Sequence, residues 1–203
     1  MSDDREAILS RVRGALAPLR DRAALPDYDM EIAVMRKMIV GRDLAELFAE
    51  RMTRVNGIVF TEPLAVVKYL RENGHFRGYC DPVLLSRLAV YFDGDFMLET
   101  NFDRTRVDDY AFGVTRAAGA IAETGTLILN DATTSRRLAA LAPWVHIALI
   151  ERAHIFADLP AAVAGLGADP NVVWCTGPSK TADVEGILIE GVHGPGVQIA
   201  LIG

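Results

Sequence analysis

The chain has 203 residues, a formal net charge of −6 and a hydrophobic fraction of 51%, which together predict a folded domain with a substantial core. No long basic run occurs and the pI is near 5.2. This argues against sequence-independent binding to nucleic acid, where phosphate neutralisation supplies most of the affinity. The N-terminus lacks the basic start and apolar core of a signal peptide, and the longest apolar stretch is shorter than a membrane span. We therefore expect a cytoplasmic protein without a membrane span.

The cysteine and histidine content predicts no metal or cofactor site on this chain. Cys80 and Cys175 lie far apart, and two cysteines cannot supply the four thiolates of an ordinary iron–sulfur cluster. We expect both to be buried free thiols. His146 lies within an apolar run, so we interpret it as a core histidine with a satisfied hydrogen bond and not as a metal ligand.

The first 56 residues predict an N-terminal helical extension. Ile8, Val12 and Leu16 recur at helical spacing, and residues 44–55 carry a second apolar stripe. Both stripes are interpreted as packing faces. They could pack on the protein's own sheet or against a second copy in a homo-oligomer.

From residue 57 onward, short apolar strands alternate with helices. We expect strands at 57–60, 76–80, 88–92, 126–129, 145–150, 172–175 and 197–202. We expect helices at 61–74, 81–88, 133–142 and 158–166, and a polar irregular segment at 93–109. The alternation predicts an α/β domain over 57–203, with a mostly parallel central sheet flanked by helices.

Three familiar motifs are approached but not matched in the C-terminal part of the chain. In GPSKT, at residues 177–181, Thr181 replaces the closing glycine of a nucleophile elbow. Ser179 stands before Lys180 where a phosphate-binding P-loop requires glycine. Residues 165–170, GLGADP, lack the last glycine of a dinucleotide fingerprint and precede a strand instead of following one.

Residues 113–131 form the first stretch that indicates a site. Glu123 lies between an apolar stretch and the turn Thr124-Gly125-Thr126, which leads into an expected strand. A carboxylate in this position is a candidate acid or base, and the turn offers hydroxyl and backbone N–H donors to an anion. The alternative is that Glu123 accepts hydrogen bonds from its own turn and adds only local order.

Residues 177–195 form the second stretch and directly follow an expected strand. Loops at the carboxyl ends of strands line the ligand crevice in open α/β sheets. Capping of a short helical turn would explain Ser179, Thr181, Asp183 and Glu185. It would not explain Lys180 or His193.

The motifs AIAETGTLIL, SRRLAALAPWVHIALIERAHIFADL and GPSKTADVEGILIEGVHGP occur in this order. Together they resemble the LUD domain of the lactate-utilisation protein C family, most closely over roughly the last 90 residues. At Lys180 that family often has arginine or asparagine. The resemblance implies a fold similar to the ribose-5-phosphate isomerase, CoA-transferase and methenyltetrahydrofolate-synthetase superfamily. It also implies a role in oxidising L-lactate to pyruvate, beside partner proteins that carry iron–sulfur clusters.

The leading hypothesis is an accessory component of such a system, which binds a small anionic ligand between the two motif stretches. Glu123 and His193 are the candidate catalytic groups, and His193 can carry a proton near neutral pH. The candidate ligand-binding residues are Thr124, Gly125, Thr126, Arg137, Gly177, Ser179, Lys180, Thr181 and Asp183. Two alternatives remain open. One is an independent enzyme acting on a phosphorylated sugar, CoA ester or folate-like substrate, and the other is a non-catalytic assembly module.

Overall fold

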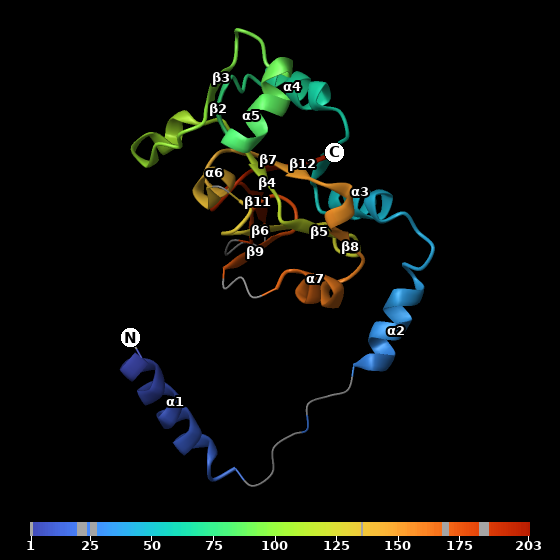
Figure 1. The fold of residues 1–203 in the computed structure, drawn as a ribbon, viewed down its shortest axis with the longest axis vertical. Helices are drawn as coiled ribbons and strands as arrows, with labels where there is room; N and C mark the ends of the chain where they lie inside the picture. Colours follow the sequence, from blue (N-terminus) through green and yellow to red (C-terminus); the bar gives the residue numbers. More distant parts are fainter. Residues whose placement is uncertain (1, 20–23, 25–27, 135, 168–170, 183–186) are drawn as a thin grey trace. The chain divides into compact units, whose positions relative to one another are not determined.

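The computed structural model describes residues 2–19, 24, 28–134, 136–167, 171–182 and 187–203. It divides into two compact units, residues 1–38 and 39–203 (Figure 1). The first unit holds helices α1 (Ser2–Leu16) and α2 (Asp29–Lys37). Helix α3 (Leu44–Arg54) belongs to the second unit. Among the described residues, no helix is long and apolar enough to cross a bilayer.

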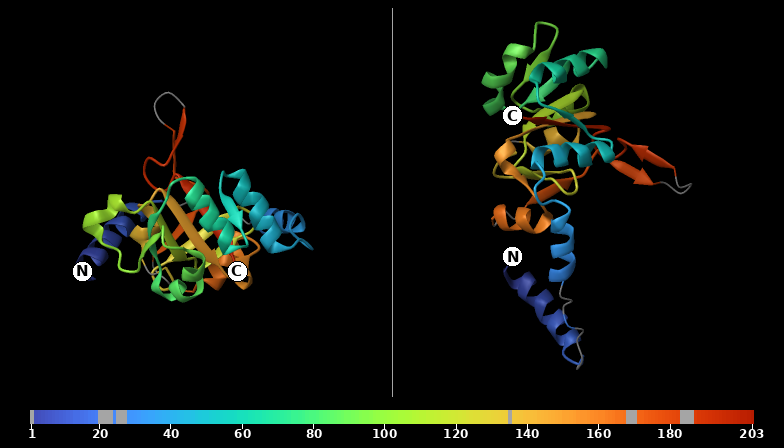
Figure 2. Two further views of the ribbon diagram at one scale, coloured as in Figure 1. Left: turned by 90° about the horizontal axis from the view of Figure 1, so that it is seen from above. Right: turned by 90° about the vertical axis from the view of Figure 1, so that its right-hand side faces the viewer.

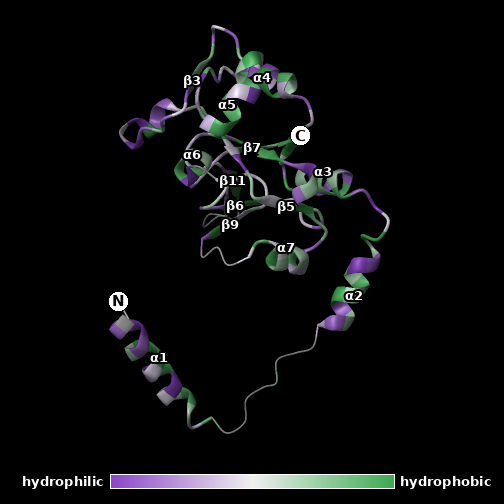
Figure 3. Ribbon diagram, viewed as in Figure 1, coloured by the Kyte–Doolittle hydropathy of each residue, from purple (hydrophilic) through white to green (hydrophobic). Residues whose placement is uncertain are grey.

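The two stripes of the expected extension differ in their surroundings. On α1, hydrophilic and hydrophobic residues alternate around the helix (Figure 3), and Ile8 remains 61% exposed. On α3, Leu47, Phe48 and Met52 are at most 1% exposed and join the core of the second unit. The α3 stripe is therefore confirmed as a packing face, and homo-oligomerisation through the N-terminal helices stays a prediction.

A six-stranded, fully parallel sheet forms the centre of the second unit, as expected. Its strands in spatial order are β1 (Ile58–Phe60), β12 (Val197–Ile202), β7 (Val145–Ile150), β4 (Phe112–Arg116), β2 (Arg77–Cys80) and β3 (Met97–Glu99). All six residues of β7 are buried. Such a continuous apolar run is typical of a parallel strand that is covered on both faces.

Helices α4 (Pro63–Glu72) and α5 (Pro82–Leu88) cover one face of the central sheet. Val66 and Leu84 from these helices share a core with Ile147 and Leu201 of the sheet. The described residues also form three short 3₁₀ turns, namely η1 (Ala89–Tyr91), η2 (Arg104–Asp109) and η3 (Arg152–His154).

A second, four-stranded sheet covers the other face, together with α3 and α6 (Arg137–Leu141). Its spatial order is β8 (Ile155–Phe156), β5 (Gly119–Ile121), β6 (Thr126–Asn130) and β9 (Val172–Cys175), with β6 antiparallel to β5 and β9. Leu127 and Leu129 of β6 face the central sheet, whereas Ile128 packs with Ala162 of α7 (Leu159–Gly165) on the outside. The layers are therefore helix, sheet, sheet and helix. A hairpin of β10 (Lys180–Ala182) and β11 (Leu188–Glu190) projects from them (Figure 2).

Several strand assignments made from the sequence are corrected. Residues 88–92 are not a strand, because α5 continues to Leu88 and η1 follows, leaving Val90 80% exposed. Strand β3 instead lies inside the segment that was expected to be irregular, and β4 and β5 were not expected. Strands 126–129 and 172–175 exist but belong to the antiparallel sheet. Residues 177–195 therefore do not follow a strand of the central parallel sheet.

The turn between β5 and β6 packs tightly on α3. Gly125 has φ +68°, and a Cβ at this position would overlap the backbone nitrogen of Met52. Only glycine combines this left-handed backbone with so close an approach. The first motif stretch, residues 113–131, therefore depends on the exact path of α3.

Replacing Gly125 by alanine should destabilise the protein more than the same change at Gly74. Gly74 has φ +73° with nothing within 4 Å, so Gly74→Ala should cost about 1–2 kcal/mol for the left-handed conformation alone. Gly125→Ala adds a backbone overlap, and we expect at least about twice that loss in the free energy of unfolding. Urea unfolding followed by tryptophan fluorescence measures both. Equal losses of unfolding free energy in the two variants would show that the backbone of α3 shifts to accommodate the added methyl group without a measurable cost.

Candidate functional site

A pocket of about 260 Å³ lies between the two sheets, where β9 of the second sheet faces β12 of the central sheet. We call it the sheet pocket. Its lining residues are Leu141, Trp174, Cys175, Thr176, Gly177, Pro178, Ser179, His193, Gly194, Pro195 and Gln198. It brings together three residues that the sequence singled out, Gly177, Ser179 and His193.

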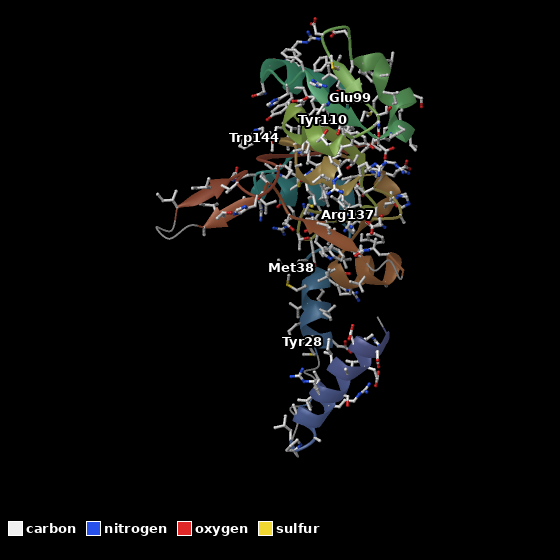
Figure 4. All side chains as sticks on the ribbon, turned by 90° about the vertical axis from the view of Figure 1, so that its left-hand side faces the viewer. Tyr28, Met38, Glu99, Tyr110, Arg137 and Trp144 are labelled. Carbon is white, nitrogen blue, oxygen red and sulfur yellow. The ribbon has the colours of Figure 1, made fainter. Side chains whose placement is uncertain are left out.

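Backbone hydrogen bonds hold the two segments that form the pocket wall. The N–H of Ser179 donates to the carbonyl of Pro195 at 2.9 Å, and the N–H of Gly191 donates to the carbonyl of Ser179 at 2.9 Å. Gly191 packs against the ring of Trp144, which lies at the base of the hairpin (Figure 4). Gly177 has φ +72°, and a Cβ there would overlap the carbonyl oxygen of Val55 at the end of α3. The glycines therefore permit this close packing.

Three threonine hydroxyls connect the β5–β6 turn to the sheet pocket. Oγ1 of Thr126 lies 2.7 Å from Oγ1 of Thr124 and 2.8 Å from Oγ1 of Thr176, and Thr176 lines the pocket. Thr126 is 4% exposed, so it supports Thr176 and does not itself meet a ligand. Sequence reasoning did not identify Thr176, although it follows an expected strand directly.

A second polar row reaches the pocket from inside the central sheet. Gln198 of β12 lies beside His146 of β7, and its Nε2 is 2.8 Å from Nδ1 and 3.4 Å from the backbone carbonyl of His146. A carbonyl oxygen only accepts hydrogen bonds, so the amide nitrogen of Gln198 faces His146. Nδ1 then accepts, and the protonated Nε2 of His146 donates to Oγ1 of Thr115 at 2.9 Å. The Oε1 of Gln198 remains as the acceptor on the pocket side.

Burial sets the charge state of this row. His146 is 0% exposed, and burial lowers its pKa from the ordinary value of 6.5 to about 4. The expectation of a core histidine with satisfied hydrogen bonds is confirmed. Gln198, 2% exposed, was not identified from the sequence, although it occupies the same place in VQIALI that His146 occupies in VHIALI.

The remaining expected ligand-binding residues lie elsewhere. The carboxylate of Glu123 accepts a hydrogen bond from the backbone N–H of Leu159 at 3.3 Å, at the start of α7. Glu123 does not line the sheet pocket, nor do Thr124, Gly125 and Thr126. Arg137 pairs through Nε with Oδ1 of Asp131 at 2.7 Å and lines a different cavity.

Lys180 points away from the sheet pocket. Its Nζ donates to the carbonyl of Val55 at 2.9 Å and lies 3.6 Å from Oε1 of Glu190. The short helical turn expected after Ser179 is instead strand β10, in which Thr181 pairs with Ile189. Asp183 and Glu185 lie outside the described residues.

Comparison with known proteins identifies the family. Residues 85–202, more than half of the chain, match the family model of the LUD domain. The chain belongs to the LUD domain family. Its fold is similar to the crystal structure of a DUF162 family protein from Deinococcus radiodurans, with a TM-score of 0.58 and 23% identity over 79% of this chain and 96% of that one.

Several curated relatives of this LUD domain carry a functional name. The chain is 35% identical over 96 residues to Lactate utilization protein C of Deinococcus radiodurans, covering 44% of this chain and 45% of that protein. It is 31% identical over 91 residues to Lactate utilization protein C of Bacillus subtilis, covering 41% and 38%. An uncharacterised protein of Neisseria meningitidis serogroup B is 38% identical over 88 residues, again covering 41% and 38%. The matched segment spans less than half the length of each relative.

Both cysteine thiols of the LUD domain are poor nucleophiles at neutral pH. Burial raises the pKa of the Cys175 thiol on the pocket wall to about 11, so it is protonated at neutral pH and a poor nucleophile. Burial also raises the pKa of Cys80, which is likewise a free thiol, to about 12. In the part of the chain that the structure describes, no three His, Cys, Asp or Glu residues gather as a metal site.

The place where open α/β sheets commonly bind ligands holds an ion pair in this LUD domain. The chain leaves the adjacent strands β2 and β4 toward opposite faces, to α5 and to β5, which makes their carboxyl ends a topological switch point. There, Nε of Arg116 donates to Oδ2 of Asp81 at 3.0 Å, and Oδ1 accepts from the N–H of Val83 at 2.9 Å. Asp81 is 0% exposed, so its carboxylate is committed to this contact.

The buried His146 should make the stability of the LUD domain fall as the pH is lowered from about 6.5 to about 4. The unfolded histidine binds a proton in this window and the folded one does not, so protonation favours unfolding. The full effect is on the order of 3 kcal/mol. The neutral variant His146→Gln lacks this titration and should show a shallower pH dependence of the free energy of unfolding. Identical pH slopes in the two proteins would contradict the assignment.

Proposed function

We propose that this LUD domain is an accessory component of a system that oxidises L-lactate to pyruvate, and that the sheet pocket binds a small 2-hydroxy acid anion. Membership of the LUD domain family and the relatives named Lactate utilization protein C support the lactate-related role. A cytoplasmic location and partners that carry iron–sulfur clusters belong to the same proposal.

The observation that carries the proposal is the meeting of Ser179, His193 and Gln198 around one small pocket. Its volume of about 260 Å³ is below the usual range for drug-sized ligands and suits a small carboxylic acid. The hydroxyl groups of Ser179 and Thr176 and the ring of His193 supply hydrogen-bond donors for the carboxylate. His193 is exposed to solvent.

Gln198 provides a means of telling a hydroxy acid from an oxo acid. Its amide nitrogen is held by His146, so its Oε1 can only accept a hydrogen bond from the ligand. L-lactate has a hydroxyl group that can donate to this oxygen. The ketone oxygen of pyruvate cannot donate, so the Oε1 of Gln198 would meet it without a hydrogen bond. The proposed site therefore favours the reduced member of the pair.

The electrons of the reaction are assigned to the partners. Conversion of lactate to pyruvate removes two electrons and two protons. The two cysteines of this chain cannot hold an ordinary iron–sulfur cluster, so the acceptor clusters belong to other proteins. The role proposed for this chain is to bind and orient the hydroxy acid.

Gln198→Leu should lower the affinity for L-lactate about tenfold while leaving that for pyruvate nearly unchanged, because only the hydroxyl loses its acceptor. Isothermal titration calorimetry with the purified chain measures both affinities. Ile199→Val is the matched control, since Ile199 lies on the same strand but packs on the opposite face of the sheet. Parallel loss of both ligands in Gln198→Leu would contradict the discrimination by Oε1.

A genetic test addresses the role in lactate oxidation. Deletion of the gene should abolish growth on L-lactate, and the intact chain should restore it. Ser179→Ala and His193→Ala should restore it poorly, because both remove donors from the pocket, whereas exposed Arg87→Gln on α5 should restore it fully. Normal growth of the deletion strain would refute the proposal. Turnover of a phosphorylated sugar, CoA ester or folate by the purified chain alone would favour an independent enzyme.

A further inference from the structure

Three arginines line a second cavity, of about 710 Å³, away from the sheet pocket. We call it the arginine cavity. Arg104 comes from η2, after β3, and Arg136 and Arg137 come from the start of α6, after β6. Asp131 and Thr134 also line it, and Phe102 and Leu138 give it an apolar wall. None of its lining residues is shared with the sheet pocket.

The arginine cavity carries positive charge that the protein does not neutralise. Arg137 pairs with Asp131 at 2.7 Å, and the other oxygen of Asp131 accepts a hydrogen bond from Nδ2 of Asn171 at 2.8 Å. Arg104 and Arg136 have no carboxylate partner anywhere in the described residues. Three arginines against one aspartate leave two unmatched positive charges.

Asp103 and Glu99 are engaged by residues other than the cavity arginines. Asp103, next to Arg104 in the chain, accepts hydrogen bonds from Thr105 and lies 3.7 Å from Nε of Arg106. Arg106 in turn pairs with Glu99 at 2.6 Å. In a chain with 27 acidic and 21 basic side chains, two unmatched arginines in one cavity indicate a place for an anion.

A cavity between α3 and α4 provides the contrast. Its volume, about 730 Å³, is similar, but its one lining arginine, Arg54, lies 2.6 Å from Glu50, and Glu62 adds a second acid to the lining. Size alone therefore does not distinguish the arginine cavity. Its unmatched positive charge does.

Several contacts fix the described segments around the arginine cavity before any ligand binds. Oγ1 of Thr134 donates to the carbonyl of Arg116 at 2.9 Å, and Oδ1 of Asn130 accepts from the N–H of Thr133 at 2.8 Å. Phe102 is buried, and its ring stacks on Tyr110 with the centroids 4.7 Å apart. Helix α6 packs closely on β4 at Gly113, because a Cβ at this position would overlap the carbonyl oxygen of Ala139 in α6. Such preorganisation lowers the entropy cost of binding.

We propose that the arginine cavity binds a small organic phosphate, a ligand that nothing in the lactate-related role requires. A phosphate monoester carries a charge near −2 at neutral pH and three acceptor oxygens, which matches two unmatched guanidinium groups with a third beside them. The planar fork of arginine suits phosphate geometry. The cavity is large enough for an organic group beyond the phosphate, which would pack on the wall formed by Phe102 and Leu138.

Binding of phenyl phosphate to the purified chain, measured by isothermal titration calorimetry, tests the proposal. Phenyl phosphate combines a dianion with an apolar ring, benzoate has the ring with one charge, and inorganic phosphate has the charge without the ring. We expect saturable binding of phenyl phosphate at one site, tighter than either comparison ligand and weaker at higher salt. Arg104→Gln and Arg136→Gln should each weaken it about tenfold or more, the loss expected for a hydrogen bond to a charged group.

Arg87→Gln is the matched control, because Arg87 is an exposed arginine on the distant helix α5 and should leave binding unchanged. Arg104 and Arg136 make no protein ion pair within the described residues, so their variants should keep the thermal midpoint of the native chain. Saturating L-lactate should not compete with phenyl phosphate, which separates this site from the sheet pocket. Absence of saturable binding, equal affinity for benzoate, or unchanged binding in both variants would overturn the proposal, whatever the result with lactate.

Discussion

Contact with the carboxyl-terminal end of α3 is the constraint on which the sheet pocket depends. Gly125 lies against the backbone of Met52, and Gly177 lies against the carbonyl of Val55, which also accepts the hydrogen bond from Lys180. A side chain at either glycine would push its segment away from α3. The antiparallel pairing of β6 with β9 sets Leu127 beside Cys175 and so places Thr126 next to Thr176, with their hydroxyl oxygens 2.8 Å apart. Helix α3, which the family motifs do not include, packs behind both motif stretches.

The sequence predicted most of the elements but could not predict which sheet some strands join. Strands at 145–150 and 197–202 are buried on both faces and read as continuous apolar runs, as parallel strands do. The runs TLIL and VVWC have the same appearance, yet they pair antiparallel in the second sheet. Burial dictates the apolar pattern, whereas pairing depends on contacts between distant segments. Leu88–Phe92 was misread for a related reason, since a short apolar run fits a helix end as well as a strand.

The candidate site was predicted in part, and the differences come from where side chains point. Gly177, Ser179 and His193 meet at one pocket, as their motif suggested. Lys180 has the same neighbours in sequence, but the strand pairing of β10 directs its ammonium group to Val55. Glu123 is directed to the start of α7 by the turn that precedes β6. Gln198 could have been found by comparing VHIALI with VQIALI, because β7 and β12 are paired in the register that places His146 beside Gln198.

The row formed by Thr115, His146 and Gln198 is costly in a way that argues for function. Apolar residues at these places would continue the core formed by Ala148, Ala200 and Leu127, with no polar group to satisfy. The polar row instead needs every partner in place, since a buried amide or imidazole without a hydrogen bond costs about 1–3 kcal/mol. Within the row the nitrogen atoms and the threonine hydroxyl satisfy one another, and the Oε1 of Gln198 is the group left facing the pocket. A fold that only needed stability would gain more from a sixth aliphatic residue in β7 and in β12, in place of His146 and Gln198. The retained acceptor has a physical use when a ligand brings the matching donor.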